Sequence, residues 1–347
     1  MKKKITARAP LRLSLAGGGT ELSPFVDDVG GAVLNATISM YTYCELEESL
    51  DNHIFYESLD LNIREKLSMD EVETSSPENL KLHHAIYQYV IKEFYNNKYI
   101  AVSIKTHSDA PVGSGLGASS TLTIAILQAF NDYLNLGLGD YELAKHAFII
   151  ERKKMNLNGG RQDQYAASFG GFNFIEFNPN DQVIVNPLRL KNEYISILES
   201  NIVLYYTGRS RESANIISSQ TKKLESGDVE IYKQLKKIKE LVNPMKNSLL
   251  RGDIKSLAKG LQENWEIKKE TSSSISTPEI NNYIDAAYNS GALAAKILGA
   301  GGGGFMMFVV PLYSRVKVIS KLKELCPQGF FYPCVFTSVG VESWEQK

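Results

Sequence analysis

The sequence predicts an α+β fold built from two lobes. Strand-like and helix-like runs occur without the strict alternation that a doubly wound parallel sheet requires. The composition changes near residue 185, and the chain beyond it is dominated by charged, amphipathic helical patterns. A chain of 347 residues is long enough for two fused lobes, each with its own core. We therefore expect an N-terminal lobe over residues 1–185 and a C-terminal lobe over residues 186–347.

The periodicity of apolar residues predicts mostly strands in the first half and helices in the second. Strands are expected at residues 5–16, 31–47, 53–59, 99–106, 170–177 and 201–206. Helices are expected at residues 80–95, 119–136 and 140–155. Amphipathic helices then fill residues 210–289, followed by two strands around a glycine turn (292–310), a helix (314–325) and a last strand (330–341).

The composition is that of an ordinary soluble enzyme, with 43% hydrophobic and 22% charged residues. A net charge of −1 provides no general basic field for nucleic acid. The chain has no apolar run of roughly 18 or more residues, and its basic start lacks the apolar stretch of a signal peptide. We expect a cytoplasmic protein with small-molecule partners, no membrane contact and three reduced core cysteines. The oligomeric state stays open.

A glycine-rich loop precedes the helix expected at residues 119–136. Its glycines let the backbone turn tightly and approach a ligand, and the helix that follows offers unpaired N–H groups and a positive dipole end. Phosphate suits such a site best, and its serines can donate to phosphate or coordinate magnesium. A flexible surface loop is the alternative. The loop residues are Pro111, Gly113, Ser114, Gly115, Leu116, Gly117, Ala118, Ser119 and Ser120.

Two common phosphate-binding motifs do not match this loop. A P-loop requires a lysine after the last glycine, and none follows here. The dinucleotide-binding fingerprint fails at its third glycine, and no acidic residue is well placed after it.

The pattern Pro-x-Gly-x-Gly-Leu-Gly-x-Ser-Ser closely resembles the phosphate-binding motif of the galactokinase, homoserine kinase, mevalonate kinase and phosphomevalonate kinase (GHMP) superfamily. Residues 9–12 with 17–21 resemble the N-terminal motif of that family, and residues 298–305 resemble its C-terminal glycine motif. All three occur in the order and rough spacing of the family. The resemblance implies an ATP-dependent kinase of two lobes, with the active site between them.

The second part of the N-terminal motif narrows the expected substrate. Galactokinases carry Gly-Glu-His-Thr-Asp where this chain has Gly-Gly-Gly-Thr-Glu at residues 17–21. This variant, together with residues 265–269, resembles the branch that contains heptose 7-phosphate kinases and fucokinase-type enzymes. It implies phosphorylation of the anomeric hydroxyl of D-glycero-D-manno-heptose 7-phosphate to the 1,7-bisphosphate, with ATP and Mg²⁺. A kinase of a free sugar such as fucose or galactose, and a sugar sensor without catalysis, are the alternatives.

The resemblance also assigns catalytic and metal-binding roles. Asp163 corresponds to the catalytic carboxylate, which accepts or orients the proton of the sugar hydroxyl, and Arg12 corresponds to the cation that holds it ionised. Ser119 and Glu151 correspond to the magnesium ligands. Without the family match, Asp163 could equally be a helix N-terminal carboxylate, and Glu151 a solvated charge at a helix end.

A further group of residues is expected to contact the sugar substrate or its phosphate. Acidic and hydroxyl groups suit sugar hydroxyls, and arginine forks match phosphate oxygens. Lys268 and Lys269 are additional candidates for the phosphate, although most such cations simply face solvent. The predicted substrate residues are Gly18, Gly19, Thr20, Glu21, Arg161, Arg209, Arg211, Gly302 and Gly303.

Overall fold

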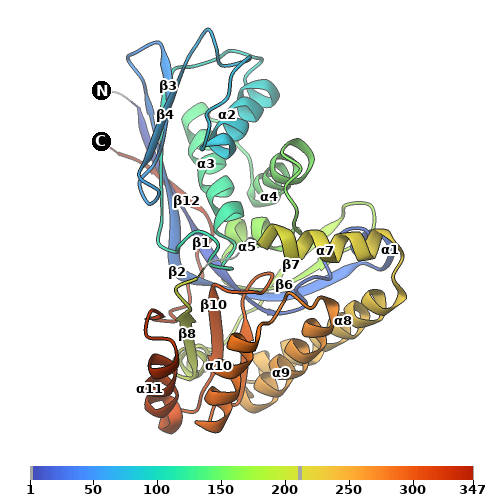
Figure 1. Ribbon diagram of the computed structural model, residues 1–347. Helices are drawn as coiled ribbons and strands as arrows, with labels where there is room; N and C mark the ends of the chain where they lie inside the picture. Colours follow the sequence, from blue (N-terminus) through green and yellow to red (C-terminus); the bar gives the residue numbers. More distant parts are fainter. Residues whose placement is uncertain (1–2, 210–212, 347) are drawn as a thin grey trace.

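The computed structural model describes residues 3–209 and 213–346 (Figure 1). In these residues the strands form an eight-stranded sheet and a separate four-stranded sheet. The larger sheet has the order β12-β1-β2-β5-β3-β4, and β6 extends from β2 and pairs with β7. Its strands are β1 (Lys4–Ala16), β2 (Gly31–Glu48), β3 (His53–Ser58), β4 (Ile63–Ser68), β5 (Val102–Ser108), β6 (Phe172–Phe177), β7 (Val183–Pro187) and β12 (Glu342–Glu345).

Strand β2 organises the larger sheet because three strands pair with it. It runs antiparallel to β1 along most of its length, to β5 at one end and to β6 at the other. The ladder between β1 and β2 shifts register at Pro10/Leu11. Proline has no N–H for the ladder, and such irregularities re-aim the following side chains. Arg12 follows directly, so the shift lies next to a predicted catalytic residue.

Helices cover one face of the larger sheet (Figure 1). Helix α3 packs on β1 and β2, and α5 packs on α3, α4 and β1. A buried apolar cluster joins these helices to the sheet and includes Leu46, Tyr87, Ile104 and Phe130. The helices are α2 (Lys81–Phe94), α3 (Ala118–Leu134), α4 (Asp140–Phe148) with its π-helical extension η1 (Ile149–Lys154), and α5 (Gln162–Phe169).

The smaller sheet has the order β11-β8-β10-β9, and helices α9 and α10 pack against its edge strand β9. Its strands are β8 (Ile202–Tyr206), β9 (Ala294–Ile297), β10 (Phe305–Val309) and β11 (Phe330–Tyr332). The remaining helices are α1 (Phe25–Val29), α6 (Asn192–Asn201), α7 (Ser213–Glu225), α8 (Val229–Leu250), α9 (Ile254–Thr271), α10 (Pro278–Asn289), η2 (Leu312–Ser314) and α11 (Arg315–Leu325).

One apolar core spans the seam between the two sheets. It contains Leu11 and Leu34 from the larger sheet, Leu204 and Met307 from the smaller sheet, and Val242 from α8. Burying a side chain of this size contributes about 1.5–3 kcal/mol. This apolar core therefore holds the two sheets against each other next to the predicted catalytic residues.

The structure agrees with the predicted α+β class and differs from several predicted elements. The helix expected at 140–155 ends at Phe148 and continues as a π-helix. Of the strand expected at 330–341, only β11 at its start forms, and β12 begins just beyond it in the other sheet. Strands β4, β7 and β12 and helices α1, α5 and α6 were not predicted. The predicted lobe boundary at residue 185 lies inside β7, and β12 of the predicted second lobe pairs with β1.

None of the described helices is long and apolar enough to cross a membrane.

Candidate active site

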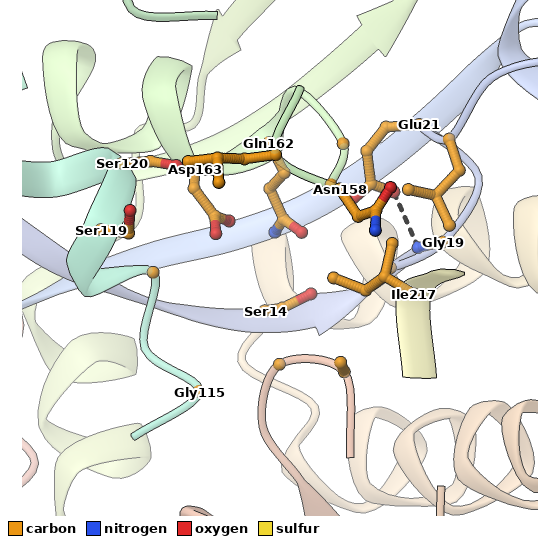
Figure 2. Close-up of a pocket in the computed structure, with 18 of the residues that line it drawn as sticks. Ser14, Gly19, Glu21, Gly115, Ser119, Ser120, Asn158, Gln162, Asp163 and Ile217 are labelled. Atoms are coloured by element: carbon orange, nitrogen blue, oxygen red, sulfur yellow. Dashed lines mark hydrogen bonds between the residues drawn. The ribbon is translucent and has the colours of Figure 1, made fainter. Parts of the chain in front are cut away.

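A cavity of about 330 Å³ lies where the three predicted motifs meet. The N-terminal motif, the glycine loop, the segment before α5, helices α7 and α9, and the C-terminal glycine turn all contribute to its wall. Asp163 and Gln162 extend into it from one side, and Ser14 faces them from the other (Figure 2). Residues far apart in the sequence thus surround one space.

Arg12 and Asp163 form a bidentate ion pair on the wall of this cavity. Arg12 Nε donates to Asp163 Oδ1 at 2.7 Å, and Nη2 donates to Oδ2 at 2.9 Å. The side chain of Arg12 is 7% exposed and that of Asp163 is 24% exposed, so the carboxylate still reaches the cavity. A guanidinium fork in this arrangement fixes the orientation of the carboxylate. The structure thus brings together the two residues predicted to be catalytic.

The same arginine also connects the catalytic pair to the glycine loop. Arg12 Nη1 donates to the carbonyl of Gly115 at 2.6 Å. Gly117 lies against the carboxylate, since a Cβ at that position would be 3.1 Å from Asp163 Cγ, and its φ is +82°. A side chain at residue 117 would therefore displace Asp163 or strain the loop.

The C-terminal glycine turn supports the loop by direct backbone contact. A Cβ on Gly115 would lie 2.5 Å from the carbonyl oxygen of Leu298, and a Cβ on Gly299 would lie 2.7 Å from Gly115 Cα. The Phe305 N–H donates to the carbonyl of Ser114 at 2.9 Å. The two motifs need glycine because their backbones touch.

The glycine loop leads into the N-terminus of α3. Gly117 caps this helix without a side-chain hydrogen bond, and the first turn carries no acidic residue. Ser119 and Ser120 lie in that turn and line the cavity. Free N–H groups and the positive end of the helix dipole therefore remain available for phosphate.

Glu151 lies buried beside this helix end, in the π-helical segment η1. Its Oε1 accepts hydrogen bonds from Ser119 Oγ at 3.2 Å and Ser120 Oγ at 3.1 Å. Its Oε2 accepts one from Gln164 Nε2 at 2.5 Å. Burial raises the pKa of the Glu151 carboxyl above its usual value. Single π-turns are frequent at functional sites, and here the turn places a carboxylate beside two hydroxyls.

Glu21 lies on the side of the cavity away from Ser119 (Figure 2), and Lys268 also lines the cavity. Glu21 Oε2 accepts a hydrogen bond from the Gly19 N–H at 2.7 Å, and burial raises the pKa of its carboxyl (Figure 2). Lys268 Nζ donates to the carbonyl of Gly299 at 2.6 Å, and burial lowers the pKa of its ammonium to about 8.

Comparison with known proteins places this geometry in a family. The family models for the N-terminal and C-terminal domains of GHMP kinases match residues 81–171 and 245–328. A Campylobacter jejuni protein named D-glycero-alpha-D-manno-heptose 7-phosphate kinase is 42% identical over 342 residues, which is 99% of both chains. The chain belongs to the GHMP kinase family. Membership confirms the predicted fold class and the predicted ATP-dependent kinase activity.

Solved structures support the same membership. A D-glycero-D-manno-heptose 1-phosphate kinase from Bacteriodes thetaiotaomicron is 38% identical, with a TM-score of 0.81 and 99% coverage of both chains. A putative sugar kinase from Campylobacter jejuni is 40% identical, with a TM-score of 0.79, over 99% of this chain and 98% of that one. A Lactococcus lactis galactokinase complexed with galactose shares the fold at 18% identity and a TM-score of 0.75, over 97% of this chain and 95% of that one.

Several predicted substrate residues of this GHMP kinase do not line the cavity. Thr20 is fully buried, and its hydroxyl bonds to the backbone of Gly17 and Ala32. It holds the turn of the N-terminal motif instead of facing a substrate. Gly302 and Gly303 lie behind the cavity wall, with the Gly302 N–H bonded to the carbonyl of Ile275.

The predicted arginines are also placed differently. Arg161 pairs with Asp181 at 2.7 Å and with Asp27 at 3.4 Å, and it does not line the cavity. Its guanidinium is therefore already engaged by two carboxylates. Arg209 is 64% exposed and pairs with Glu279 at 2.7 Å. The prediction for Arg211 lies outside the described residues.

Most of the remaining predicted site residues line the cavity, and two do not. Gly18, Gly19, Glu21, Gly113, Ser114, Gly115, Gly117, Ala118, Ser119, Ser120 and Glu151 line the cavity of the GHMP kinase. Pro111 and Leu116 do not, and Leu116 is buried in the apolar core at the seam.

Sequence reasoning missed several polar residues of the wall. Ser14, Asn158, Gln162 and Gln220 line the cavity. Within residues 3–209 and 213–346, Ser14 Oγ and Gln162 Nε2 are buried without a hydrogen-bond partner, so each can bond to a ligand. Gln162 immediately precedes Asp163, and that adjacency was the available signal. The others are single polar residues in segments without a motif, so the sequence carried no signal for them.

Proposed function

We propose that this kinase transfers the γ-phosphoryl group of ATP to the anomeric hydroxyl of D-glycero-D-manno-heptose 7-phosphate and forms the 1,7-bisphosphate. The observation that carries the proposal is the Arg12–Asp163 pair, which faces the cavity beside the glycine loop. The substrate is proposed from the relative named heptose 7-phosphate kinase, which matches the chain at 42% identity over its whole length.

The proposed reaction assigns a role to each wall of the cavity. The N-terminus of α3 and the glycine loop hold the triphosphate. The anomeric oxygen attacks the γ-phosphorus, the bond to the β–γ bridging oxygen breaks, and ADP leaves. Asp163 accepts or orients the proton of the attacking hydroxyl. Arg12 holds Asp163 in a fixed orientation through two hydrogen bonds.

Mg²⁺ is proposed as the metal cofactor, held by Glu151 and Ser119 with Ser120 beside them. The donors are oxygens, which Mg²⁺ prefers. Glu151 is buried, and among the described residues its one ion pair is a long one, 4.0 Å from its Oε2 to Arg152 Nη2. When bound, Mg²⁺ would neutralise charge on the triphosphate and complete its ligand shell with phosphate oxygens and water.

The sugar is proposed to bind on the opposite side of the cavity. Glu21, Gly18 and Gly19 line that part, and Ser14 and Gln162 add polar groups without partners. Such groups can bond to the hydroxyls of a polyol. We also propose that the protein acts in the cytoplasm, which fits three buried cysteines that remain free thiols.

A coupled assay of ADP release would test this function. The panel is D-glycero-D-manno-heptose 7-phosphate, the unphosphorylated heptose, fucose and galactose, each with ATP and Mg²⁺. We expect kcat/KM to be highest on the heptose 7-phosphate. Equal or greater efficiency on fucose or galactose would favour a free-sugar kinase, and ligand binding without turnover on any sugar would favour a sensor.

A further inference from the structure

Lys268 combines burial, a position on the cavity wall and incomplete hydrogen bonding. It projects from α9, it is 9% exposed, and its Nζ donates to the Gly299 carbonyl at 2.6 Å. An ammonium carries three N–H donors, so two remain after this bond. Among residues 3–209 and 213–346, no carboxylate lies within the 4.0 Å of an ion pair with Lys268. The ammonium is therefore buried without a direct counter-ion.

The charged groups around Lys268 come from four other elements. Glu21 and Asp163 attract its charge, whereas Arg12 and Lys296 repel it. Asp163 is already bound by Arg12, and Glu21 by the N–H of Gly19. Lys296 Nζ, on β9, is buried and donates to the carbonyl of Ser14 at 2.9 Å. Both nearby carboxylates are thus engaged elsewhere.

The other cations of the cavity wall are less available. Arg12 is committed to Asp163 and to the loop. Arg152 bonds to backbone carbonyls of residues 157 and 160 and lies beside Glu151. Lys268 differs because, in the part of the chain that the structure describes, its one hydrogen-bond partner is the neutral carbonyl of Gly299. Burying an ammonium without a counter-ion is costly, and a phosphate in the cavity would supply that counter-ion.

We propose that Lys268 is a catalytic residue that binds a phosphate group in the cavity. The phosphate is either the one transferred from ATP or the one the acceptor already carries. The proposal rests on the proposed function only through the second source. It also gives α9, in the second half of the chain, a direct part in the reaction together with the catalytic pair on β1 and α5.

Two variants of Lys268 and one control test the proposal. Lys268→Met removes the charge at similar length, and Lys268→Arg keeps it. Lys269→Met is the matched control, because Lys269 is the next residue on the helix, lies off the cavity wall and pairs with Glu266 at 2.7 Å. We expect Lys268→Met to lower kcat/KM about tenfold to a hundredfold, the usual effect of losing one charge-assisted contact. The control should stay within about twofold of wild type.

The pH dependence of kcat/KM distinguishes two roles of Lys268, a charged ligand of the phosphate and a side chain that only packs in the cavity wall. In the free enzyme, Lys268 is protonated below a pKa of about 8 and neutral above it. Wild-type kcat/KM should therefore fall above about pH 8, and Lys268→Arg should move that alkaline limb to higher pH, because arginine stays charged. A limb that stays in place in Lys268→Arg would overturn the proposal.

Nucleotide titration and the choice of acceptor identify the source of the phosphate. If the phosphate comes from ATP, Lys268→Met weakens calorimetric binding of a non-hydrolysable ATP analogue or lowers kcat equally on every acceptor. If it belongs to the acceptor, only phosphorylated sugars lose efficiency. An unchanged rate and unchanged nucleotide affinity in a folded Lys268→Met, judged by Tm, would overturn the proposal. Should the heptose 7-phosphate fail as substrate, the ATP arm still applies with whichever sugar the wild type accepts.

Discussion

Replacing Asp163 by asparagine tests the catalytic pair most directly. The amide keeps the shape of the side chain but exchanges one of two acceptor oxygens for a donor. Both oxygens accept from Arg12, at 2.7 and 2.9 Å, so the amide N–H₂ of the variant would face a guanidinium N–H₂. The variant therefore keeps one of the two hydrogen bonds and loses the proton acceptor.

The expected effects on rate and stability differ in size. Loss of a general base typically lowers the rate by roughly 10²–10⁴-fold, and we expect kcat to fall in that range. Stability should also fall, because the variant leaves the buried guanidinium of Arg12 without its counter-ion. Breaking a fully buried pair costs roughly 3–5 kcal/mol, and the loss should be smaller here because Asp163 is partly exposed and one hydrogen bond is kept.

The assay is initial-rate ADP release at saturating sugar and ATP, with nucleotide affinity measured separately by calorimetry. Asp181→Asn is a matched control, because Asp181 also pairs with an arginine, is 59% exposed and lies off the cavity wall. Nucleotide affinity should be nearly unchanged in both variants. A kcat for Asp163→Asn within about threefold of wild type would refute the catalytic role.

Three further changes should have separable effects. Gly115→Ala should weaken nucleotide binding and lower Tm, because its Cβ would lie 2.5 Å from a backbone oxygen. Gly137→Ala is the control, since Gly137 has a similar φ but open space around it; this variant should lower Tm slightly and leave binding intact. Gln164→Leu should raise the Mg²⁺ concentration needed for half-maximal rate by roughly 10-fold or more, since Gln164 orients Glu151; an unchanged Mg²⁺ titration would contradict this role. Glu151→Gln should abolish Mg²⁺-dependent activity yet raise Tm at pH 8. Burial raises the folded-state pKa of Glu151, so ionising it costs stability as pH rises through that value, and the gain should shrink at low pH. Equal Tm differences at pH 5 and pH 8 would argue against this account.

The sequence predicted the parts of the site that carry local motifs. The glycine loop was predicted from glycine spacing and local chemistry, whereas Arg12, Asp163 and Glu151 were assigned from the family resemblance of their segments. Their contacts were not predictable in this way, since Arg12 and Asp163 are separated by 151 positions and meet only through the fold. The bidentate geometry is a property of β1 and α5 packed together.

The wrong predictions also arose because contacts that form only in the folded chain cannot be predicted from the local sequence. Thr20 looked like a sugar ligand because hydroxyls bind hydroxyls, but the turn uses that hydroxyl to satisfy its own backbone. Arg209 looked like a phosphate ligand, but it projects into solvent beside Glu279. Strand β4 was missed because four of its six residues are charged or polar, as suits the edge of a sheet.

The backbone contact between Gly115 and Gly299 makes nucleotide binding depend on both halves of the chain. The loop expected to receive the phosphates of ATP is only half of a structure whose other half comes from the smaller sheet. A fragment that ends before α6 would keep every residue of the glycine loop but lose the backbone that supports it. Affinity for ATP therefore measures the docking of one sheet on the other, and a nucleotide should make both melt as a single cooperative unit.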